Sequence, residues 1–492
     1  MKHPINKVTL PSLTIDLLQE NGQLIDNVFS TLWQQAGMKM ILNRCGFTKR
    51  SGTAIHQVVY TLSLWLWLKK ESIGMFARDS LKDMGKDVLY DTLNREDLNW
   101  RKCHELLAYK AYRGFNLNRK KAFVVDDTIA QRFGKKMPGI SSHFDHTTGR
   151  HMMGQQVLTL GLSCEEGFIP LDSELFTSQV KAQPLVHSFK DGRCTVAKRY
   201  RSAEQETKPD MVASMIKRAL RAGIAGDYLL ADAWFGSKAM LRLCEETDLV
   251  ALLRMKKSKL KYRITDTIDA RQVKQEMDAK ALYQHSARKQ WQRIAGQKYQ
   301  AKVVDVEVNL TENTKDPATW TKVRLLFARG TTGQEKAQVG KHDWALFLCT
   351  DLSMSPTDML QLYALRWAIE VYFKEAKQHL GLLKEQSNHY AAYIASIHLS
   401  AIRFCLLVMA KQRQGAGSVA QIRDRLCGNS QKISFSQQLW PVFRAIITGA
   451  LDTLSEVLGE KALLIMQTID NHIQHFFMQV LQLDPEMLRR ET

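Results

Sequence analysis

The sequence has little of what defines several large protein classes. Its 492 residues contain only 10 Pro and 27 Gly and show no internal period, which excludes a collagen-like or repeat-built chain. No run approaches the roughly 18 consecutive apolar residues that cross a bilayer, so we expect no membrane segment. The eight cysteines are scattered without a Cys-x-x-Cys pair, which argues against a disulfide framework or a zinc ribbon and favours a reduced, cytoplasmic protein.

Acidic residues are also scarce relative to basic ones. There are 50 Asp and Glu against 69 Lys and Arg, which gives a formal net charge of +19. With 45% hydrophobic residues the chain can build large cores, so it is not a disordered polyelectrolyte. A surplus of this sign favours a polyanionic partner, most commonly nucleic acid.

The local patterns divide the chain into five regions. The first is helical, and both a DNA-binding domain and a plain helical scaffold are open for it. A short β-branched run then begins an α/β region, which a basic and strand-rich segment interrupts before a buried strand and a long helix resume it. The expected boundaries are 1–118 (helical), 119–245 (core, first part), 246–343 (β-rich insertion), 344–412 (core, second part) and 413–492 (helical, with a possible role in dimerisation).

Two predicted strands end in aspartate, and a downstream helix carries a glutamate. The candidates for a shared site are Asp127, Asp232 and Glu370. Carboxylates are the ligands that Mg²⁺ prefers, and a pair of such ions can promote in-line displacement at phosphorus. Taken singly, each acidic residue is more often a cap, a turn residue or a solvated surface charge.

The helix expected over residues 358–381 places four polar side chains in one stripe. At about 100° per residue, Tyr363, Arg366, Glu370 and Lys377 fall within roughly 60° of one another. A surface helix with an i,i+4 ion pair would explain Arg366 and Glu370, but not the tyrosine and lysine beside them. A separate apolar stripe suited to packing on a sheet contains Leu362, Leu365, Ile369, Tyr372 and Ala376.

The string Y-x2-R-x3-E-x6-K formed by these four residues resembles the signature of the IS4-type bacterial insertion-sequence transposases, which belong to the DDE class. The run 124–128 (VVDDT) resembles the first acidic motif of that family. The run 229–236 (LLADAWFG) resembles its second, usually a strand followed by D-[SA]-W-[YF]-G. With a β-rich insertion between the second aspartate and the glutamate, the resemblance covers about 120–410.

The resemblance implies an α/β fold: an RNase H-like catalytic core interrupted by a β-rich insertion, with helical N- and C-terminal regions. It implies that Asp127, Asp232 and Glu370 are catalytic and hold Mg²⁺, which Mn²⁺ can replace. Neighbouring residues of a strand point to opposite faces, so only one of Asp126 and Asp127 can face the metals. Asp127 is chosen by analogy with relatives, and Asp126 is the alternative.

The resemblance also implies DNA contacts. By analogy with relatives, Tyr363 and Arg366 would contact the DNA backbone near the transposon end, and Lys377 would contact a nearby phosphate. Cleavage there proceeds through a DNA hairpin with a flipped base stacked on a tryptophan, and Trp344 stands at the matching place, although a plain core aromatic is equally open. The basic segment with Arg254, Lys256 and Lys257 is expected to follow a DNA backbone, a solvated face being the alternative.

The expected function is therefore a DNA transposase that binds the terminal inverted repeats of an insertion sequence, cleaves them, and joins the 3′ ends to target DNA. Its partners would be double-stranded DNA and a second copy of the chain, as a homodimer on DNA, with no membrane and a cytoplasmic, nucleoid-associated location in a bacterium. Two alternatives stay open: a structure-selective RNase H-like nuclease that never joins strands, and a non-catalytic DNA-binding protein derived from a transposase.

Overall fold

The computed structural model divides the chain into two compact units, residues 1–99 with 409–492, and residues 100–408. We describe each unit by itself. The residues that the structure describes are 19–20, 23–24, 27–81, 84–134, 136–145, 149–177, 185–268, 271–286, 291–294, 299–312, 316–330, 344–415, 417–428 and a few positions between 431 and 472.

Among its described residues, the first unit is helical apart from one short hairpin. A cluster of aromatic rings forms its core, with Phe29 5.4 Å from Tyr60 and 5.9 Å from Trp67 between ring centroids. Residues 419–428 add a helix, and most of the predicted C-terminal region beyond them lies outside the described residues. The elements are β1 (Gln19–Glu20), β2 (Gln23–Leu24), α2 (Asn27–Gln35), α3 (Met38–Arg44), α4 (Ile55–Leu64), α5 (Ile73–Ser80) and α6 (Lys86–Leu93).

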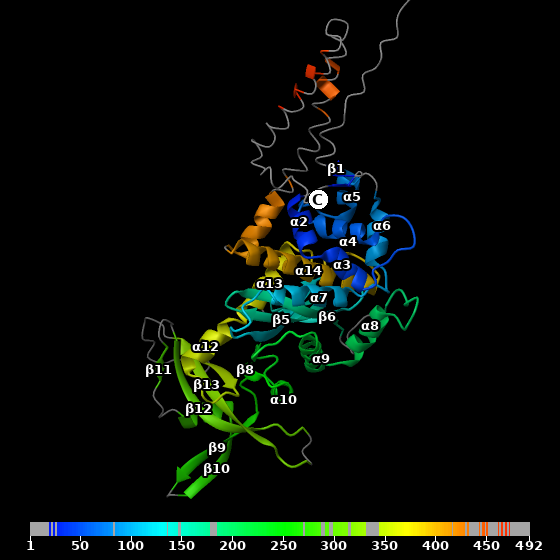
Figure 1. The fold of residues 1–492 in the computed structure, drawn as a ribbon. Helices are drawn as coiled ribbons and strands as arrows, with labels where there is room; N and C mark the ends of the chain where they lie inside the picture. The colour runs from blue at the N-terminus through cyan, green and yellow to red at the C-terminus, as the bar shows by residue number, and fades with distance from the viewer. Residues whose placement is uncertain are drawn as a thin grey trace, which may run out of the picture. The chain divides into compact units, whose positions relative to one another are not determined.

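The second unit is built on a mixed β-sheet (Figure 1). Its centre has the strand order β6-β5-β3-β7-β8, in which β3, β5 and β6 are antiparallel neighbours and β7 and β8 run parallel to β3. This is the arrangement of an RNase H-like core, so the predicted fold class is confirmed. The strands are β3 (Ala122–Gln131), β4 (Ile140–Asp145), β5 (Arg150–Cys164), β6 (Gly167–Phe176), β7 (Tyr228–Ala231) and β8 (Val250–Met255).

The predicted insertion continues the same sheet. Strand β14 pairs antiparallel with β8, and β13, β12, β9 and β10 follow it outward. Strand β8 belongs to the core, so the inserted chain begins after it. The elements are β9 (Lys261–Ile268), β10 (Arg271–Asp278), α11 (Ala279–His285), β11 (Gln292–Arg293), β12 (Tyr299–Asn309), β13 (Trp320–Gly330) and β14 (Trp344–Cys349).

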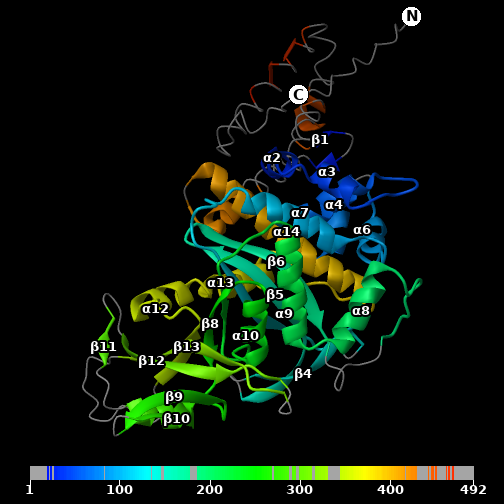
Figure 2. The same cartoon turned by 60° about the horizontal axis from the view of Figure 1, so that its bottom comes forward.

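Helices cover both faces of the central strands, with α7, α13 and α14 on one side and α8 and α9 on the other (Figures 1 and 2). Helix α7 packs on β6 and so lies in this unit, although it falls within the predicted N-terminal region. Helix α14 is long and apolar enough to cross a membrane, but its most apolar window is wholly buried, as in a core helix. The helices are α7 (Trp100–Tyr112), α8 (Thr195–Gln205), α9 (Lys208–Arg221), α10 (Lys238–Glu246), α12 (Pro356–Ala364), α13 (Trp367–Gln378) and α14 (Tyr390–Gln414).

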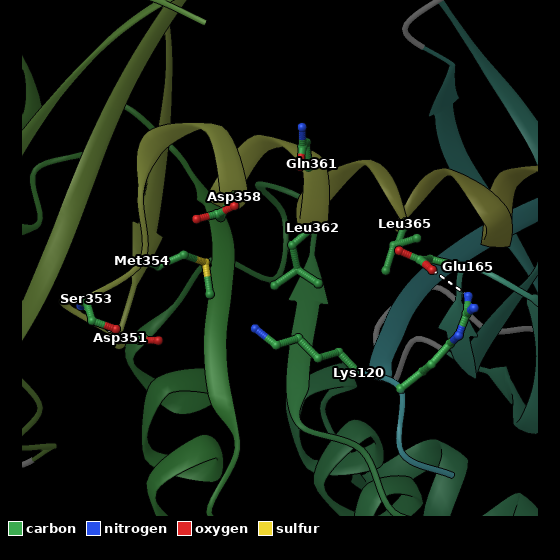
Figure 3. A pocket seen from close by; sticks show the side chains of 10 residues that line it. Lys120, Glu165, Asp351, Ser353, Met354, Asp358, Gln361, Leu362 and Leu365 are labelled. Carbon is green, nitrogen blue, oxygen red and sulfur yellow. Dashed lines mark hydrogen bonds and ion pairs between the residues drawn. The ribbon is translucent and has the colours of Figure 1, made fainter. Parts of the chain in front are cut away.

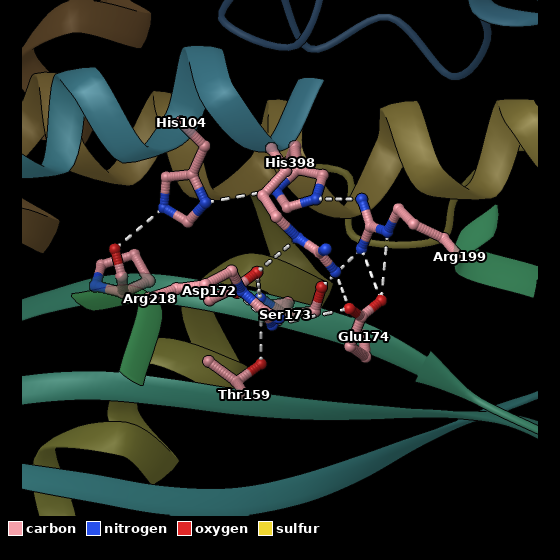
Figure 4. A network of polar contacts seen from close by, with 10 residues as sticks. His104, Thr159, Asp172, Ser173, Glu174, Arg199, Arg218 and His398 are labelled. Atoms are coloured by element: carbon pink, nitrogen blue, oxygen red, sulfur yellow. Dashed lines mark hydrogen bonds and ion pairs between the residues drawn. The ribbon is translucent and has the colours of Figure 1, made fainter. Parts of the chain in front are cut away.

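A buried charge network joins four of these helices to β6 (Figure 4). Arg218 lies 2.7 Å from Asp172, and Arg199 lies 2.7 Å from Glu174. Burial alone would raise the pKa of Asp172, but the charges of the surrounding arginines outweigh it and hold that pKa well below its ordinary value. The groups around the two carboxylates are Arg101, His104, Arg199, Arg218 and His398.

Candidate active site

Two aspartates come side by side at the centre of the sheet. The parallel register of β3 and β7 pairs Val125 with Ala231, and the next residues along the two strands are Asp126 and Asp232. Side chains at paired positions of neighbouring strands point to the same face. Asp126 and Asp232 therefore share one face of the sheet. The prediction that a strand ends at each acidic motif is right for β7, which ends at Ala231, and wrong for β3, which continues to Gln131.

The two carboxylates also act on each other electrostatically. Burial raises the pKa of Asp126, and the charge of Asp232 raises it further, to about 7. Asp232 is held by its own turn, because its Oδ1 accepts the backbone N–H of Trp234 at 2.9 Å. Two acids pressed together in a partly buried place repel each other, which is the electrostatic situation that a cation relieves.

Asp127 points away from this pair. Its Oδ1 accepts a hydrogen bond from Nε2 of Gln156 at 2.7 Å, and its Oδ2 forms an ion pair with Nζ of Lys208 at 2.7 Å. The contacts thus favour Asp126 over Asp127 as the first carboxylate of the site. Neighbouring residues in β3 face opposite sides, and only the strand register decides which one faces Asp232.

The signature residues lie on two helices rather than on the one long helix expected. Helix α12 ends at Ala364 and α13 begins at Trp367. Between them, Leu365 N–H donates to Leu362 O and Arg366 N–H to Tyr363 O, both at 3.0 Å, which is the tighter i→i+3 pattern. The hydroxyl of Ser163 on β5 donates to Leu365 O at 2.9 Å and fixes this junction to the sheet.

Arg366 connects the helix to the aspartates. Its Nη1 donates to Asp126 Oδ2 at 2.9 Å, and its Nη2 donates to Glu370 Oε1. The i,i+4 ion pair considered from the sequence therefore forms, and the same guanidinium also reaches β3. One planar cation joins Asp126, the alternative to Asp127 in the predicted triad, to Glu370, a geometry that suits the fork of arginine.

The other two signature residues also face this region. The Tyr363 hydroxyl donates to Ala231 O, the residue before Asp232, at 3.2 Å. Burial raises the pKa of Tyr363 to about 12, so the phenol stays protonated and acts as a donor at neutral pH. Lys377 Nζ donates to Ile129 O of β3 at 2.8 Å. The four signature residues thus all lie beside strand β3 and the end of strand β7. In the predicted apolar stripe, Ile369, Tyr372 and Ala376 are buried.

Trp344 is a core aromatic. It is 6% exposed, and it stacks on Tyr283 with 4.6 Å between centroids and 4° between planes. Nζ of Lys257 lies 4.1 Å from its centroid and occupies the other face, because the stacked ring leaves no room on the first. A nucleobase could stack on Trp344 only by displacing Lys257, so the geometry favours the core alternative.

The first residue of the basic segment, Arg254, lies near the aspartates. Arg254 is exposed, and its charge acts to lower the pKa of Tyr363, as does that of Arg366. Gly236 allows this approach: a Cβ on it would lie 2.3 Å from the carbonyl oxygen of Arg254. The glycine of the second motif is thus needed because β8 passes directly over the turn after Asp232. Further along the segment, Arg263 forms an ion pair with Glu307 inside the insertion.

The donor chemistry of the site suits a divalent metal ion. Asp126, Asp232 and Glu370 offer carboxylate oxygens alone, the ligands of Mg²⁺ and Mn²⁺. In the part of the chain that the structure describes, no three His, Cys, Asp or Glu side chains are gathered as a ready metal site. The guanidinium of Arg366 lies between Asp126 and Glu370, and it therefore separates the Glu370 carboxylate from the two aspartates.

A cavity of about 580 Å³ lies where the central strands β3 and β8 begin, at the opposite end of these strands from Asp232 (Figure 3). It opens between Lys120, which precedes β3, and Asp351, which follows β14. Because β14 runs antiparallel to β8, its end lies beside the beginning of β8, opposite to Asp232. Residues of α12 and its junction line the cavity, but Tyr363 and Arg366 are not among them. Its lining is Arg119, Lys120, Glu165, Asp351, Ser353, Met354, Asp358, Gln361, Leu362 and Leu365.

Sequence reasoning missed the ion pair of Lys208 and the exposure of Trp234. Lys208 begins α9 about eighty residues from Asp127, and nothing in the local pattern announces their ion pair. Trp234 lies within the second motif, two residues after Asp232, and is 45% exposed, which is unusual for an indole.

The fold and this carboxylate site define a class, the RNase H-like nucleases with acidic active sites. More specifically, the chain belongs to the family of DDE superfamily endonucleases, whose model matches residues 47–324. That span contains Asp126 and Asp232 and ends before Glu370. The search of curated proteins gives no match. Among solved structures, a piggyBac transposase synaptic complex with hairpin DNA is similar, at 11% identity and a TM-score of 0.41, covering 85% of this chain and 82% of that one.

Proposed function

We propose that this chain is a DNA transposase of the IS4 type. It would bind the terminal inverted repeats of an insertion sequence, cleave them by metal-dependent phosphodiester hydrolysis through a hairpin intermediate, and join the 3′ ends to target DNA. One observation carries the proposal: Asp126 and Asp232 lie side by side, and Arg366 links Asp126 to Glu370. Membership of a DDE endonuclease family supports the nuclease part.

In this proposal Asp126, Asp232 and Glu370 hold Mg²⁺, with Mn²⁺ able to replace it. When bound, the metal supplies activation of the attacking oxygen and stabilisation of the leaving oxygen. Asp126 takes the place that sequence analogy gave to Asp127, since Asp127 is engaged by Lys208 and Gln156.

The cationic and phenolic side chains around the carboxylates would hold the DNA backbone. Tyr363 stays protonated and can donate to a phosphate oxygen, and Arg366 offers donors that its two carboxylates do not fully use. Lys377 lies beside β3. Arg254 and Lys256 lie at the end of β8, on the other side of β7. Lys257, set on Trp344, extends this basic surface. Neutralising several phosphates would make binding strongly salt-dependent.

Two DNA ends must be cut together, so we expect a homodimer assembled on DNA. We expect the protein in the bacterial cytoplasm, associated with the nucleoid. The DNA on either side of the coding region tests the biological assignment directly: short inverted repeats bracketed by a target duplication support it, and their absence in an intact locus contradicts it.

A strand-transfer assay tests the proposed reaction. Precut duplexes carrying the flanking repeats are incubated with supercoiled plasmid, protein and Mg²⁺. Joined products support a transposase. Cleavage of uncut ends without joining of precut ones would favour a structure-selective nuclease, and binding without any metal-dependent nicking would favour a non-catalytic DNA-binding protein.

A further inference from the structure

Lys208 is a buried lysine at an unfavourable position in the fold. It is 7% exposed, and it is the first residue of α9, directly after the N-cap residue Thr207. Burial disfavours an ammonium group, and the positive end of the helix dipole disfavours it further. Replacing a buried ion pair by uncharged groups often costs a protein nothing, so stability alone gives no reason for a lysine here.

The ammonium group of Lys208 contacts three elements at once. Its Nζ lies 2.7 Å from Oδ2 of Asp127 on β3. The same atom lies 4.9 Å from the ring centroid of Phe176 at the end of β6, and 4.3 Å from that of Trp234 in the turn after β7. The carboxylate and the negative faces of the two rings compensate the charge of the ammonium. Lys208 therefore joins β3 to the turn that follows β7.

The two aspartates of the site lie just past the end of a backbone ladder. Strands β3 and β7 are paired as far as Val125 and Ala231, and Asp126 and Asp232 are the next residues. Beyond this point β3 stays paired with β5, whereas the chain after β7 enters a turn. Mg²⁺ demands ligand oxygens in near-ideal geometry at about 2.0–2.1 Å. The separation of the two carboxylates therefore depends on what holds the turn after Asp232.

The contacts of Lys208 link that turn to β3. On one side Lys208 lies over the indole of Trp234, whose backbone N–H donates to Asp232 Oδ1 at 2.9 Å. On the other side it pairs with Asp127, the residue after Asp126. Each carboxylate of the site is thus a neighbour, by one peptide bond or one hydrogen bond, of a residue that Lys208 contacts.

We propose that Lys208 is a positioning residue for the metal site, which sets the separation of Asp126 and Asp232 by tying Asp127 to Trp234. The inference rests on the proposed function, because it concerns the same carboxylates. Lys208 touches neither metal nor DNA in this role, since its partner Asp127 points to the opposite face of β3 from Asp126. A purely electrostatic role predicts the opposite effect on metal binding, because removal of a cation strengthens the attraction of the site for a divalent ion.

Binding of Mn²⁺ to the full chain, followed by electron paramagnetic resonance without DNA, tests the proposal. Lys208→Met removes the ammonium and keeps the apolar body of the side chain. We expect it to weaken Mn²⁺ binding about 10- to 100-fold, the usual loss when a group that orients metal ligands is removed. Lys208→Met combined with Asp127→Asn leaves the net charge unchanged and should show the same loss, whereas Asp127→Asn alone loses less than about 10-fold.

A second variant removes the other end of the link. Trp234 is 45% exposed, so Trp234→Ala spares the core of the protein. It should weaken Mn²⁺ binding about 2- to 30-fold, which corresponds to the loss of one cation–π contact. It keeps the ion pair of Lys208 with Asp127, so its effect separates the link to the turn from the pairing on β3.

An exposed ion pair that begins on the same helix provides the matched control. Lys217 of α9 lies 3.0 Å from Glu246, and the two side chains are 53% and 57% exposed. Lys217→Met combined with Glu246→Gln removes the same two charges and should leave Mn²⁺ binding unchanged.

Four results overturn the role of Lys208. They are wild-type Mn²⁺ binding by the charge-neutral double variant of Lys208 and Asp127, tighter binding by Lys208→Met, an equal loss in the Lys217 control, and an equal loss in Asp127→Asn alone, which would make Asp127 the ligand. Wild-type Mn²⁺ binding by Trp234→Ala overturns the link to the turn. If the wild-type protein itself binds no Mn²⁺, the proposed metal-dependent function fails.

Discussion

Arg366 reaches from the α12–α13 junction to the middle of the sheet, where its Nη1 donates a 2.9 Å hydrogen bond to Oδ2 of Asp126. Its other terminal nitrogen donates to Glu370. These residues are 240 and 4 positions away from it in the chain. The tighter i→i+3 turn at Tyr363–Arg366, fixed by Ser163, aims the guanidinium at both carboxylates.

Replacing Arg366 by lysine should impair DNA cleavage about 10- to 100-fold. A single ammonium cannot donate in two directions to Asp126 and Glu370, and a hydrogen bond to a charged group contributes about 1.5–3 kcal/mol. Cleavage rates on a plasmid carrying both flanking repeats measure the effect. Arg263→Lys is the matched control, because it weakens an arginine–carboxylate pair within the insertion and should change the rate less than twofold. Equal rates for Arg366→Lys and wild type would contradict the role given to the bridge.

The two neighbouring aspartates of β3 should respond differently to the same change. Asp126→Asn removes a carboxylate that faces Asp232 and should lower cleavage more than about 100-fold, since even changes around metal ligands cost 10- to 100-fold. Asp127→Asn retains an acceptor for Gln156 and Lys208 and should lower cleavage less than about 10-fold, with a measurable loss in the free energy of unfolding. The reverse order of rates would restore Asp127 as the first ligand.

Gly236→Ala should destabilise the protein and displace Asp232. The added methyl group would lie 2.3 Å from the carbonyl oxygen of Arg254, so either β8 or the turn must move, at a cost of about 1–3 kcal/mol. Urea unfolding measures the loss. Gly330→Ala is the control, since a Cβ there meets nothing within 4 Å. If both variants unfold at the same urea concentration as wild type, the close approach of β8 is not a constraint.

The buried histidine pair should make the fold sensitive to acid. Arg199 Nη1 donates to His398 Nε2 at 2.6 Å, and His104 Nε2 lies 2.8 Å from Pro170 O, so the 3.2 Å contact between the two Nδ1 atoms requires both rings neutral. Burial lowers the pKa of His104 to about 4 and, with Arg199, that of His398 well below its ordinary value.

Because these folded-state pKa values lie below the unfolded value of about 6.5, protons bind preferentially to the unfolded chain under acid conditions. The stabilisation is complete above pH 6.5 and is lost as the pH falls from about 6.5 towards 4, by about 1.4 kcal/mol per pH unit for each histidine. Denaturant unfolding between pH 7.5 and 5 measures this slope. His104→Gln should make it shallower, whereas the exposed His187→Gln should not; a slope unaffected by His104→Gln would contradict the account.

Much of this arrangement could be predicted from local sequence patterns. The strand that carries Asp126 and Asp127, the strand end at Asp232, the insertion, and the side of the α13 helix that packs on the sheet all follow from short periodic runs. The strand end predicted at Asp127 is wrong, because β3 continues to Gln131. The choice between Asp126 and Asp127 could not, because it depends on the register of β3 against β7, which are about a hundred residues apart. The ion pair of Asp127 with Lys208 is equally non-local.

The surroundings of individual side chains also could not be predicted from the sequence. The sequence places Trp344 at the beginning of a strand, but only the fold shows that Tyr283 and Lys257 cover its faces. The helix period similarly suggests one continuous helix through Arg366, because no proline or glycine marks the junction there. Its tightening comes from the anchor on Ser163, a contact 202 residues away in sequence.

Metal-dependent cleavage by the Asp232→Asn variant tests the central claim most directly. The substrate is a supercoiled plasmid carrying both flanking repeats, assayed with Mg²⁺, with Mn²⁺ and with EDTA, and binding to a labelled repeat is measured in parallel. We expect the wild-type protein to cut in either metal and not in EDTA, and Asp232→Asn to bind the repeat within about twofold of wild type while cutting more than 100-fold more slowly. Undiminished cleavage by Asp232→Asn would contradict the assignment of this site.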